Sequence, residues 1–147
     1  MKTRELGIAV VGSGRIGSLR AQMAAAHPAV NFLAVSDLSA DRAAALAERT
    51  GADFSSANNE AVISHRQVNA VIVSTSEHEH LKPVMQALEL GKPVLVEKPI
   101  ALTLADADQI IAKSEATGTP VYVGYAQRFK RRYLSAKDQI LEGRVGQ

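Results

Sequence analysis

The chain has 147 residues, 46% of them hydrophobic and 22% charged, which is enough for one globular domain with a buried core. Its formal net charge of +2 is too small to favour nucleic acid or an anionic membrane as a partner. It contains no cysteine, which excludes disulfides, thiol nucleophiles and thiolate metal sites and fits a reducing, cytoplasmic location. No apolar run approaches the roughly 20 residues that span a bilayer, so we expect neither a membrane partner nor a signal peptide.

Apolar runs alternate with helical patterns along the chain, which is typical of a parallel sheet with helices in the crossovers. The pattern predicts strands over residues 6–11, 30–36, 53–55, 69–74, 93–97 and 120–125. It predicts helices over residues 15–26, 59–64, 80–90, 104–117 and 129–141, and another from a cap at Ser39 or Asp41 to about residue 49. We therefore expect an α/β fold, in which residues 1–147 form one doubly wound Rossmann domain with helices on both faces and strand order 3-2-1-4-5-6.

Three glycines follow the first predicted strand at the spacing of a dinucleotide-binding loop. Gly12, Gly14 and Gly17 form the pattern G-x-G-x-x-G where the strand ends and a helix begins. Gly12 permits the tight turn, Gly14 leaves the backbone open to a diphosphate, and Gly17 lets the helix pack close to the strand. A purely structural glycine turn is the alternative. The predicted diphosphate site consists of Gly12, Ser13, Gly14, Arg15 and Ile16.

An acidic residue closes the second predicted strand. Asp37 lies twenty residues after Gly17, where dinucleotide sites place the acid that hydrogen-bonds the adenosine ribose, and we assign Leu38 to the same site. A carboxylate repels a 2′-phosphate, so we expect NAD as the cofactor. Ser39 and Arg42 lie close behind and could soften this preference, which keeps NADP possible. We favour the interpretation of Arg42 as a solvated helix charge.

Polar residues also end the fourth and fifth predicted strands. The strand order reverses between the first and fourth strands, so a ligand should lie across their carboxyl ends. Ser74, Thr75 and Ser76 end the fourth strand, and Glu97 and Lys98 end the fifth. Side chains alternate along a strand, so Glu97 and Lys98 should point to opposite sides. A lysine here could hold a substrate hydroxyl or take its proton, although most lysines at strand ends are solvated charges.

Three segments resemble the N-terminal domain of the Gfo/Idh/MocA family, named after glucose–fructose oxidoreductase, inositol dehydrogenase and rhizopine catabolism. They are the glycine loop, residues 87–99, which read Ala-Leu-Glu-Leu-Gly-Lys-Pro-Val-Leu-Val-Glu-Lys-Pro, and residues 123–129, which read Val-Gly-Tyr-Ala-Gln-Arg-Phe. Residues 143–146, Gly-Arg-Val-Gly, resemble the passage out of this domain. The resemblance covers essentially the whole chain, and Glu-Lys-Pro with its upstream Gly-Lys is the most specific part.

The resemblance implies NAD(P)-dependent oxidation of a sugar or polyol alcohol, or the reverse reduction. It implies that Lys98 is the catalytic lysine, which orients the reacting oxygen and assists proton transfer, and that Glu97 lines the cofactor cleft. It also implies a cis peptide before Pro99, and Arg128 and His80 near the cofactor. Where the family often reads Thr-Pro-Asn-x-x-His, residues 75–80 read Thr-Ser-Glu-His-Glu-His, so the histidine matches and the proline and asparagine do not.

Family enzymes continue into a second α/β domain, which supplies the substrate pocket, an Asp and a His of the active site, and the oligomer interface. Residues 1–147 hold no such domain. By this resemblance the chain is a fragment that binds cofactor and turns over little or no substrate. The resemblance also implies that the full-length protein is a homo-oligomer and that its partner is a small sugar or polyol.

Other classes of function receive less support. A non-catalytic dinucleotide sensor on the same fold is the main alternative, and Lys98 argues against it. The basic run of residues 128–132 could suggest nucleic acid, but the rest of the chain shows no basic stripe, so we expect no nucleic-acid partner. His78 and His80 lie among glutamates in one short segment, without a partner set elsewhere, so we expect no metal.

Overall fold

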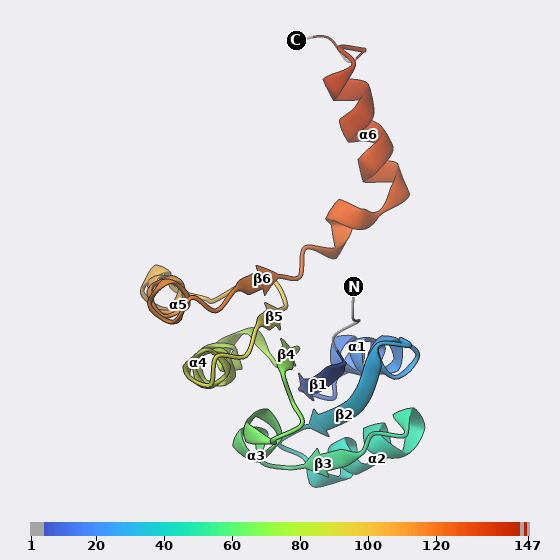
Figure 1. The fold of residues 1–147 in the computed structure, drawn as a ribbon. Coiled ribbons are helices and arrows are strands. Elements are labelled where there is room, and N and C mark those ends of the chain that lie inside the picture. The colour runs from blue at the N-terminus through green and yellow to red at the C-terminus, as the bar shows by residue number, and fades with distance from the viewer. Residues whose placement is uncertain (1–4, 145, 147) are drawn as a thin grey trace.

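The computed structural model describes residues 5–144 and 146 and contains a six-stranded parallel sheet in the order β3-β2-β1-β4-β5-β6 (Figure 1). The predicted strand order is therefore confirmed. The strands are β1 (Leu6–Val11), β2 (Val30–Ser36), β3 (Phe54–Ser56), β4 (Ala70–Val73), β5 (Val94–Val96) and β6 (Val121–Val123). The helices are α1 (Arg15–Ala25), α2 (Ala40–Thr50), α3 (Asn59–Ser64), α4 (Leu81–Glu89), α5 (Leu104–Thr117) and α6 (Arg131–Leu141), with 3₁₀ turns η1 (Glu77–Glu79) and η2 (Ala126–Phe129).

Local capping residues set several helix ends. The Ser39 hydroxyl accepts a hydrogen bond from the Arg42 backbone N–H, which identifies Ser39 rather than Asp41 as the cap of α2. The Thr103 hydroxyl accepts from the Asp106 N–H at 3.1 Å and begins α5 in the same way. Gly118 ends that helix in the left-handed conformation, at φ 65°. These ends follow from single residues, and the sequence therefore predicts them well.

The core has two layers because successive side chains of the central strands point to opposite faces. On one face, β1, β2 and β4 pack against α3, α4 and α5 around residues such as Val11, Val73 and Leu88. On the other face, Val10 and Val35 pack against α1 and α2. Burial on both faces explains the continuous apolar runs of these strands.

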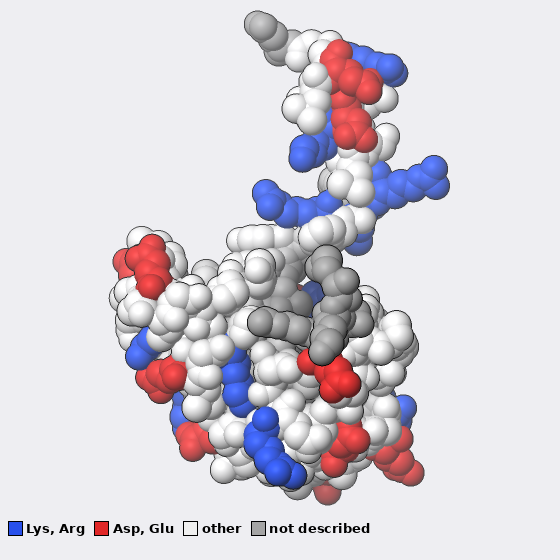
Figure 2. All heavy atoms as spheres, in the orientation of Figure 1, with Lys and Arg blue, Asp and Glu red and all other residues white. Residues whose placement is uncertain are grey.

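The C-terminal helix α6 extends away from the sheet, and its main contacts are with η2 (Figure 1). None of its described residues is buried. Figure 2 shows Lys and Arg side chains gathered where α6 leaves the rest of the molecule, and the exposed basic residues of this segment are Arg128, Lys130, Arg131 and Arg132. Among the described residues, no helix is long and apolar enough to cross a membrane.

Several predicted elements extend one or two residues beyond the observed ones, namely β4, β5, β6, α1 and α4. Two others begin later than predicted. The strand predicted at residues 53–55 is Phe54–Ser56, one residue later. The helix predicted from Phe129 begins at Arg131, because residues 126–129 form the 3₁₀ turn η2 and Lys130 has an extended backbone. A short 3₁₀ turn has no long periodic pattern from which it could be predicted.

Candidate functional site

Two glycines of the loop between β1 and α1 pack closely against other backbone atoms, and the third is exposed. Gly12 has φ +98°, and a Cβ there would lie 2.7 Å from the Ser74 carbonyl oxygen. A Cβ at Gly17 would lie 1.7 Å from the Gly12 carbonyl oxygen, so only glycine permits this approach of α1 to the loop. A Cβ at Gly14 would meet no atom within 4 Å. The loop is therefore fixed by two glycines, and its backbone at the third is uncovered.

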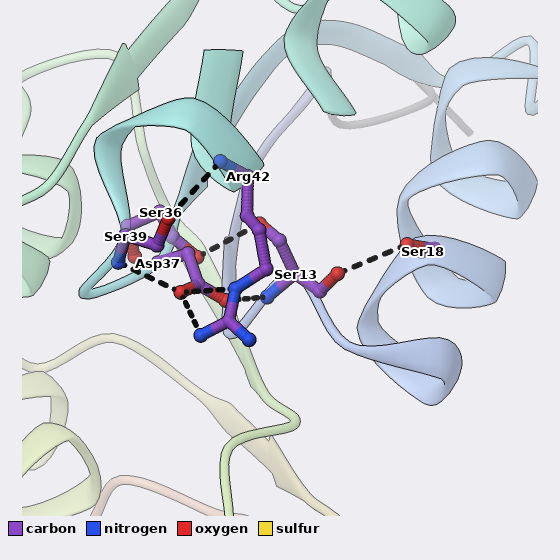
Figure 3. A network of polar contacts seen from close by, with 6 residues as sticks. All are labelled: Ser13, Ser18, Ser36, Asp37, Ser39 and Arg42. Atoms are coloured by element: carbon purple, nitrogen blue, oxygen red, sulfur yellow. Dashed lines mark hydrogen bonds and ion pairs between the residues drawn. The ribbon is translucent and has the colours of Figure 1, made fainter. Parts of the chain in front are cut away.

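Asp37 is the centre of a polar network at the end of β2 (Figure 3). One carboxylate oxygen, Oδ2, accepts from the Ser13 N–H at 2.9 Å, and the other, Oδ1, accepts from the Ser39 N–H at 2.9 Å. The Arg42 guanidinium donates to Oδ1 from Nε at 3.0 Å and from Nη2 at 2.7 Å. Arg42 is thus solvated as expected, with its side chain 64% exposed, but its guanidinium also pairs with a fixed carboxylate on the preceding loop, which was not expected.

The network keeps Asp37 ionised although the residue is only 7% exposed. Burial by itself would raise the pKa of the carboxyl. The backbone N–H groups of Ser39 and Ser13 and the Arg42 guanidinium together outweigh burial, and the pKa of Asp37 is lowered from its ordinary value. The site therefore presents a charged, well-oriented acceptor at the end of β2.

At the end of β5, Glu97 pairs with Arg20 of α1 and not with Lys98. The Arg20 guanidinium donates to Glu97 Oε1 from Nε at 2.7 Å, and its Nη2 lies 2.6 Å from the same oxygen in an ion pair. The Glu97 carboxylate packs so closely against Gly124 that a Cβ on this glycine would lie 2.9 Å from Oε2. Lys98 is exposed, and none of the ion pairs among the described residues involves it. The lysine is thus available to a ligand.

One cleft of about 680 Å³ joins these two regions. It runs across the carboxyl ends of the strands, with Asp37 and Lys98 among its lining residues. The predicted site residues that line it are Gly12, Gly14, Arg15, Ile16, Asp37, Leu38, Ser74, Thr75, Ser76, Glu97 and Lys98. The structure therefore brings together residues that are far apart in the sequence, because the carboxyl ends of parallel strands share one edge of the sheet.

Three predicted site residues do not line the cleft. Ser13 lies beneath it and donates to Asp37. Arg128 is exposed in η2, next to the lining residue Gln127. His80 is only 1% exposed, with Nδ1 2.9 Å from the Pro99 carbonyl oxygen and Nε2 3.3 Å from that of Thr75. Its ring links the loops after β4 and β5, which favours a supporting position over direct contact with a ligand.

Several lining residues were not predicted from the sequence. They are Asn59, Glu77, Glu79, Gly124, Tyr125, Ala126 and Gln127, and Arg42 lines the cleft as well. Of these, only residues 124–127 carried a signal, since they belong to a segment that resembles the family. Arg20 was also missed, although it follows Gly17 by one helical turn and so lies on the side of α1 nearest the sheet.

The polar groups along the cleft fit a dinucleotide. The first turn of α1 contains no acidic residue that would repel an anion, and N–H groups at a helix N-terminus can donate to one above the open Gly14. Ser74 Oγ and Thr75 Oγ1 are buried and have no hydrogen-bond partner among the described residues. Asp37 presents a charged acceptor at the cleft. The peptide between Lys98 and Pro99 is cis, as the resemblance implies.

The sequence profile of the Gfo/Idh/MocA family, described as an oxidoreductase family with an NAD-binding Rossmann fold, matches residues 6–125. The chain belongs to this family. It is 30% identical over 139 residues to myo-inositol 2-dehydrogenase of Thermotoga maritima, a match that covers 95% of this chain and 42% of that protein. It is 32% identical over 139 residues to the NAD⁺-dependent scyllo-inositol 2-dehydrogenase of Bacillus subtilis, covering 94% and 41%.

Solved structures agree with the fold of this Gfo/Idh/MocA domain. A probable dehydrogenase from Thermotoga maritima superposes with a TM-score of 0.87 at 30% identity, covering 96% of this chain and 42% of that one. Scyllo-inositol dehydrogenase from Lactobacillus casei, solved with bound NAD(H) and scyllo-inositol, has a TM-score of 0.89 at 23% identity and the same coverage. The chain thus spans less than half the length of these relatives.

Proposed function

We propose that the chain is the coenzyme-binding domain of an NAD-dependent dehydrogenase that acts on the CH–OH group of a cyclic polyol or a sugar. The observation that carries the proposal is the single cleft that joins the glycine loop and Asp37 to Lys98. This cleft crosses the point between β1 and β4 where the strand order reverses, which is where doubly wound sheets bind their ligands.

The two ends of the cleft supply different parts of dinucleotide binding. Asp37 would accept hydrogen bonds from the adenosine ribose, and the loop around Gly14 would hold the diphosphate against the N-terminus of α1. The unpartnered hydroxyls of Ser74 and Thr75 lie between this loop and β5 and would donate to the coenzyme. The nicotinamide would then reach the end of β5, beside Lys98.

Lys98 lines the cleft and is exposed, which supports a role in binding the reacting oxygen of the substrate. NAD, when bound, supplies the hydride acceptor. The Lys98 ammonium group would donate a hydrogen bond to the substrate oxygen and orient it, and in its neutral form it would take the hydroxyl proton. Arg20 occupies the neighbouring Glu97 carboxylate, so Lys98 is not neutralised by the residue next to it. This arrangement supports proton transfer at one oxygen.

The relatives support the proposed substrate class. Two of those matched are named as inositol 2-dehydrogenases, and the chain spans 42% of the length of each. We propose that the remaining length of such a protein supplies the substrate-binding side of the cleft and the contacts of a homo-oligomer. The chain by itself would bind NAD and show little or no turnover.

Calorimetric titration with NAD tests coenzyme binding, and Gly14→Val is the informative variant. A Cβ at this position meets no atom of the fold within 4 Å, and Gly14 is exposed, so the variant should fold normally. It would, however, occupy the place of the diphosphate, and we expect affinity for NAD to fall about tenfold or more. Ala25→Val adds similar bulk at an exposed position at the far end of the same helix and should bind as the wild type does. Equal affinity in all three proteins contradicts the proposal.

Turnover by the gene product that contains this chain tests the substrate class. A panel of inositols, aldoses and simple aliphatic alcohols is assayed by the absorbance of NADH. We expect reduction of NAD with at least one cyclic polyol or sugar and none with the simple alcohols. Activity confined to the simple alcohols contradicts the proposed substrate class and leaves the coenzyme site intact.

A further inference from the structure

The pairing of Arg42 with Asp37 bears on which coenzyme the cleft admits. The Arg42 side chain is 64% exposed and that of Asp37 is 8% exposed, so a fixed carboxylate holds a mobile guanidinium at the rim. Both residues line the cleft, as does Leu38. Figure 3 shows the Arg42 guanidinium directed at the Asp37 carboxylate. The ribose region therefore carries one negative and one positive charge, 2.7 Å apart, and not a lone carboxylate.

The hydrogen bonds of Asp37 show what an adenosine ribose would meet there. Oδ2 accepts one N–H, from Ser13, and keeps one lone pair. Oδ1 receives three donors, one from the Ser39 backbone and two from Arg42. A ribose diol could donate one hydroxyl to Oδ2 directly. The other hydroxyl reaches Oδ1 only when the guanidinium moves aside.

A 2′-phosphate would meet the same pair differently. Asp37 alone repels such a group, which is the usual basis of preference for NAD. Here the guanidinium beside it offsets the repulsion and presents a planar fork of N–H donors that suits phosphate oxygens. Since Arg42 is mostly exposed, it can leave Oδ1 and follow the phosphate without disturbing buried structure.

We propose that Arg42 is a specificity-determining residue that lets this cleft bind NADP as well as NAD. The diol of NAD would use the Asp37 carboxylate, and the 2′-phosphate of NADP would use the Arg42 guanidinium. The inference rests on the proposed function, because it assumes that the adenosine half of a dinucleotide lies beside Asp37. It concerns only the choice between the two coenzymes.

Calorimetric titration of the chain with NAD⁺ and, separately, NADP⁺ tests this proposal through the ratio of the two dissociation constants. The wild type should bind both. Arg42→Leu should weaken NADP⁺ about tenfold or more, because a hydrogen-bonded charge pair is lost. The ratio of the two dissociation constants should shift by at least this factor, because the guanidinium no longer competes with the ribose diol of NAD⁺ for Oδ1. Asp37→Asn should move the ratio the opposite way, since it removes the repelling charge and the preferred acceptor of the diol.

Arg49→Leu is the matched control, because this arginine lies on the same helix and donates to Ser18 at 3.2 Å and not to Asp37. It should leave the ratio unchanged. An unchanged ratio in Arg42→Leu, or a wild type that binds NAD⁺ but not NADP⁺, overturns the inference and spares the proposed function. A wild type that binds neither coenzyme overturns both. Thermal unfolding of each variant verifies that the ratio is measured on folded protein.

Discussion

At the scale of single residues, the three glycines of the loop between β1 and α1 are not equivalent. Gly12 and Gly17 are required by the fold, because a Cβ on either would overlap backbone atoms. Gly14 is not required by the fold, because a Cβ there would project into open space. The motif thus contains two glycines that the fold requires and a third that it does not require. We attribute the third glycine to the approach of a bound diphosphate.

Alanine substitutions separate these demands. We expect Gly17→Ala to lower the free energy of unfolding by about 1–3 kcal/mol or more, because the added methyl forces α1 away from the Gly12 carbonyl. Gly14→Ala should change it by less than about 0.5 kcal/mol. Urea denaturation followed by circular dichroism measures both. Equal stability of the two variants would mean that α1 is not packed closely against the Gly12 carbonyl group.

At the scale of elements, the ion pair between Arg20 and Glu97 joins α1 to the end of β5. Both side chains are mostly buried, at 20% and 15% exposure, and the carboxylate also packs against Gly124. The pair therefore fixes three consecutive parts of the cleft, namely the first helix, the strand end that carries Lys98 and the segment after β6.

Removal of one partner leaves the other charge without compensation. Arg20→Met should therefore lower the free energy of unfolding by roughly 1–3 kcal/mol, and weaken NAD binding as the end of β5 loosens. Lys113→Met breaks a more exposed pair with Glu89, at 30% and 58% exposure, and should cost less than about 1 kcal/mol. Denaturation and calorimetry of both variants measure these effects, and an equal cost would argue against a structural role for Arg20.

The sequence predicted individual elements better than the contacts between them. The bounds of β1, β2, α3 and α5 agree with the predicted ranges. Clear apolar runs mark β1 and β2, and Thr103 and Gly118 mark the ends of α5. The sheet edge that holds the site was also predictable, since parallel strands share it. Arg20 and Glu97 lie 77 residues apart, and no local pattern reports such a pair. Nor does any local pattern show that Arg42 turns back toward Asp37.

At the scale of the whole molecule, one cleft extends from Asp37 to Lys98 across the carboxyl ends of the strands. Lys98 is exposed at this cleft, and α6 extends away from the sheet without any buried residue (Figure 1). The chain also spans only about 42% of the length of its matched relatives. We therefore propose that this chain binds the coenzyme, and that turnover needs a substrate-binding part like the length of the relatives that the chain does not match.

The role of Lys98 is tested by turnover of the gene product that contains this chain. Lys98→Met should lower kcat with the preferred polyol by about 10²-fold or more and leave the Kd for NAD within about threefold. Lys137→Met, on the exposed surface of α6, removes a lysine of the same kind far from the cleft and should leave both constants unchanged. Unaltered turnover in Lys98→Met would exclude a catalytic role for this lysine.

The two edges of the parallel sheet carry different residues: one edge carries the cleft, and the other carries contacts that hold the fold together. All the cleft residues come after strands, whereas the residues that hold the opposite edge come before them. There the Lys92 ammonium group donates to the carbonyl oxygens of Ile63 and His65, and the Asn69 amide contacts the backbone of Gly7 and Glu5. Substitutions at the edge held by Lys92 and Asn69 can therefore change thermal stability without altering the residues that line the cleft.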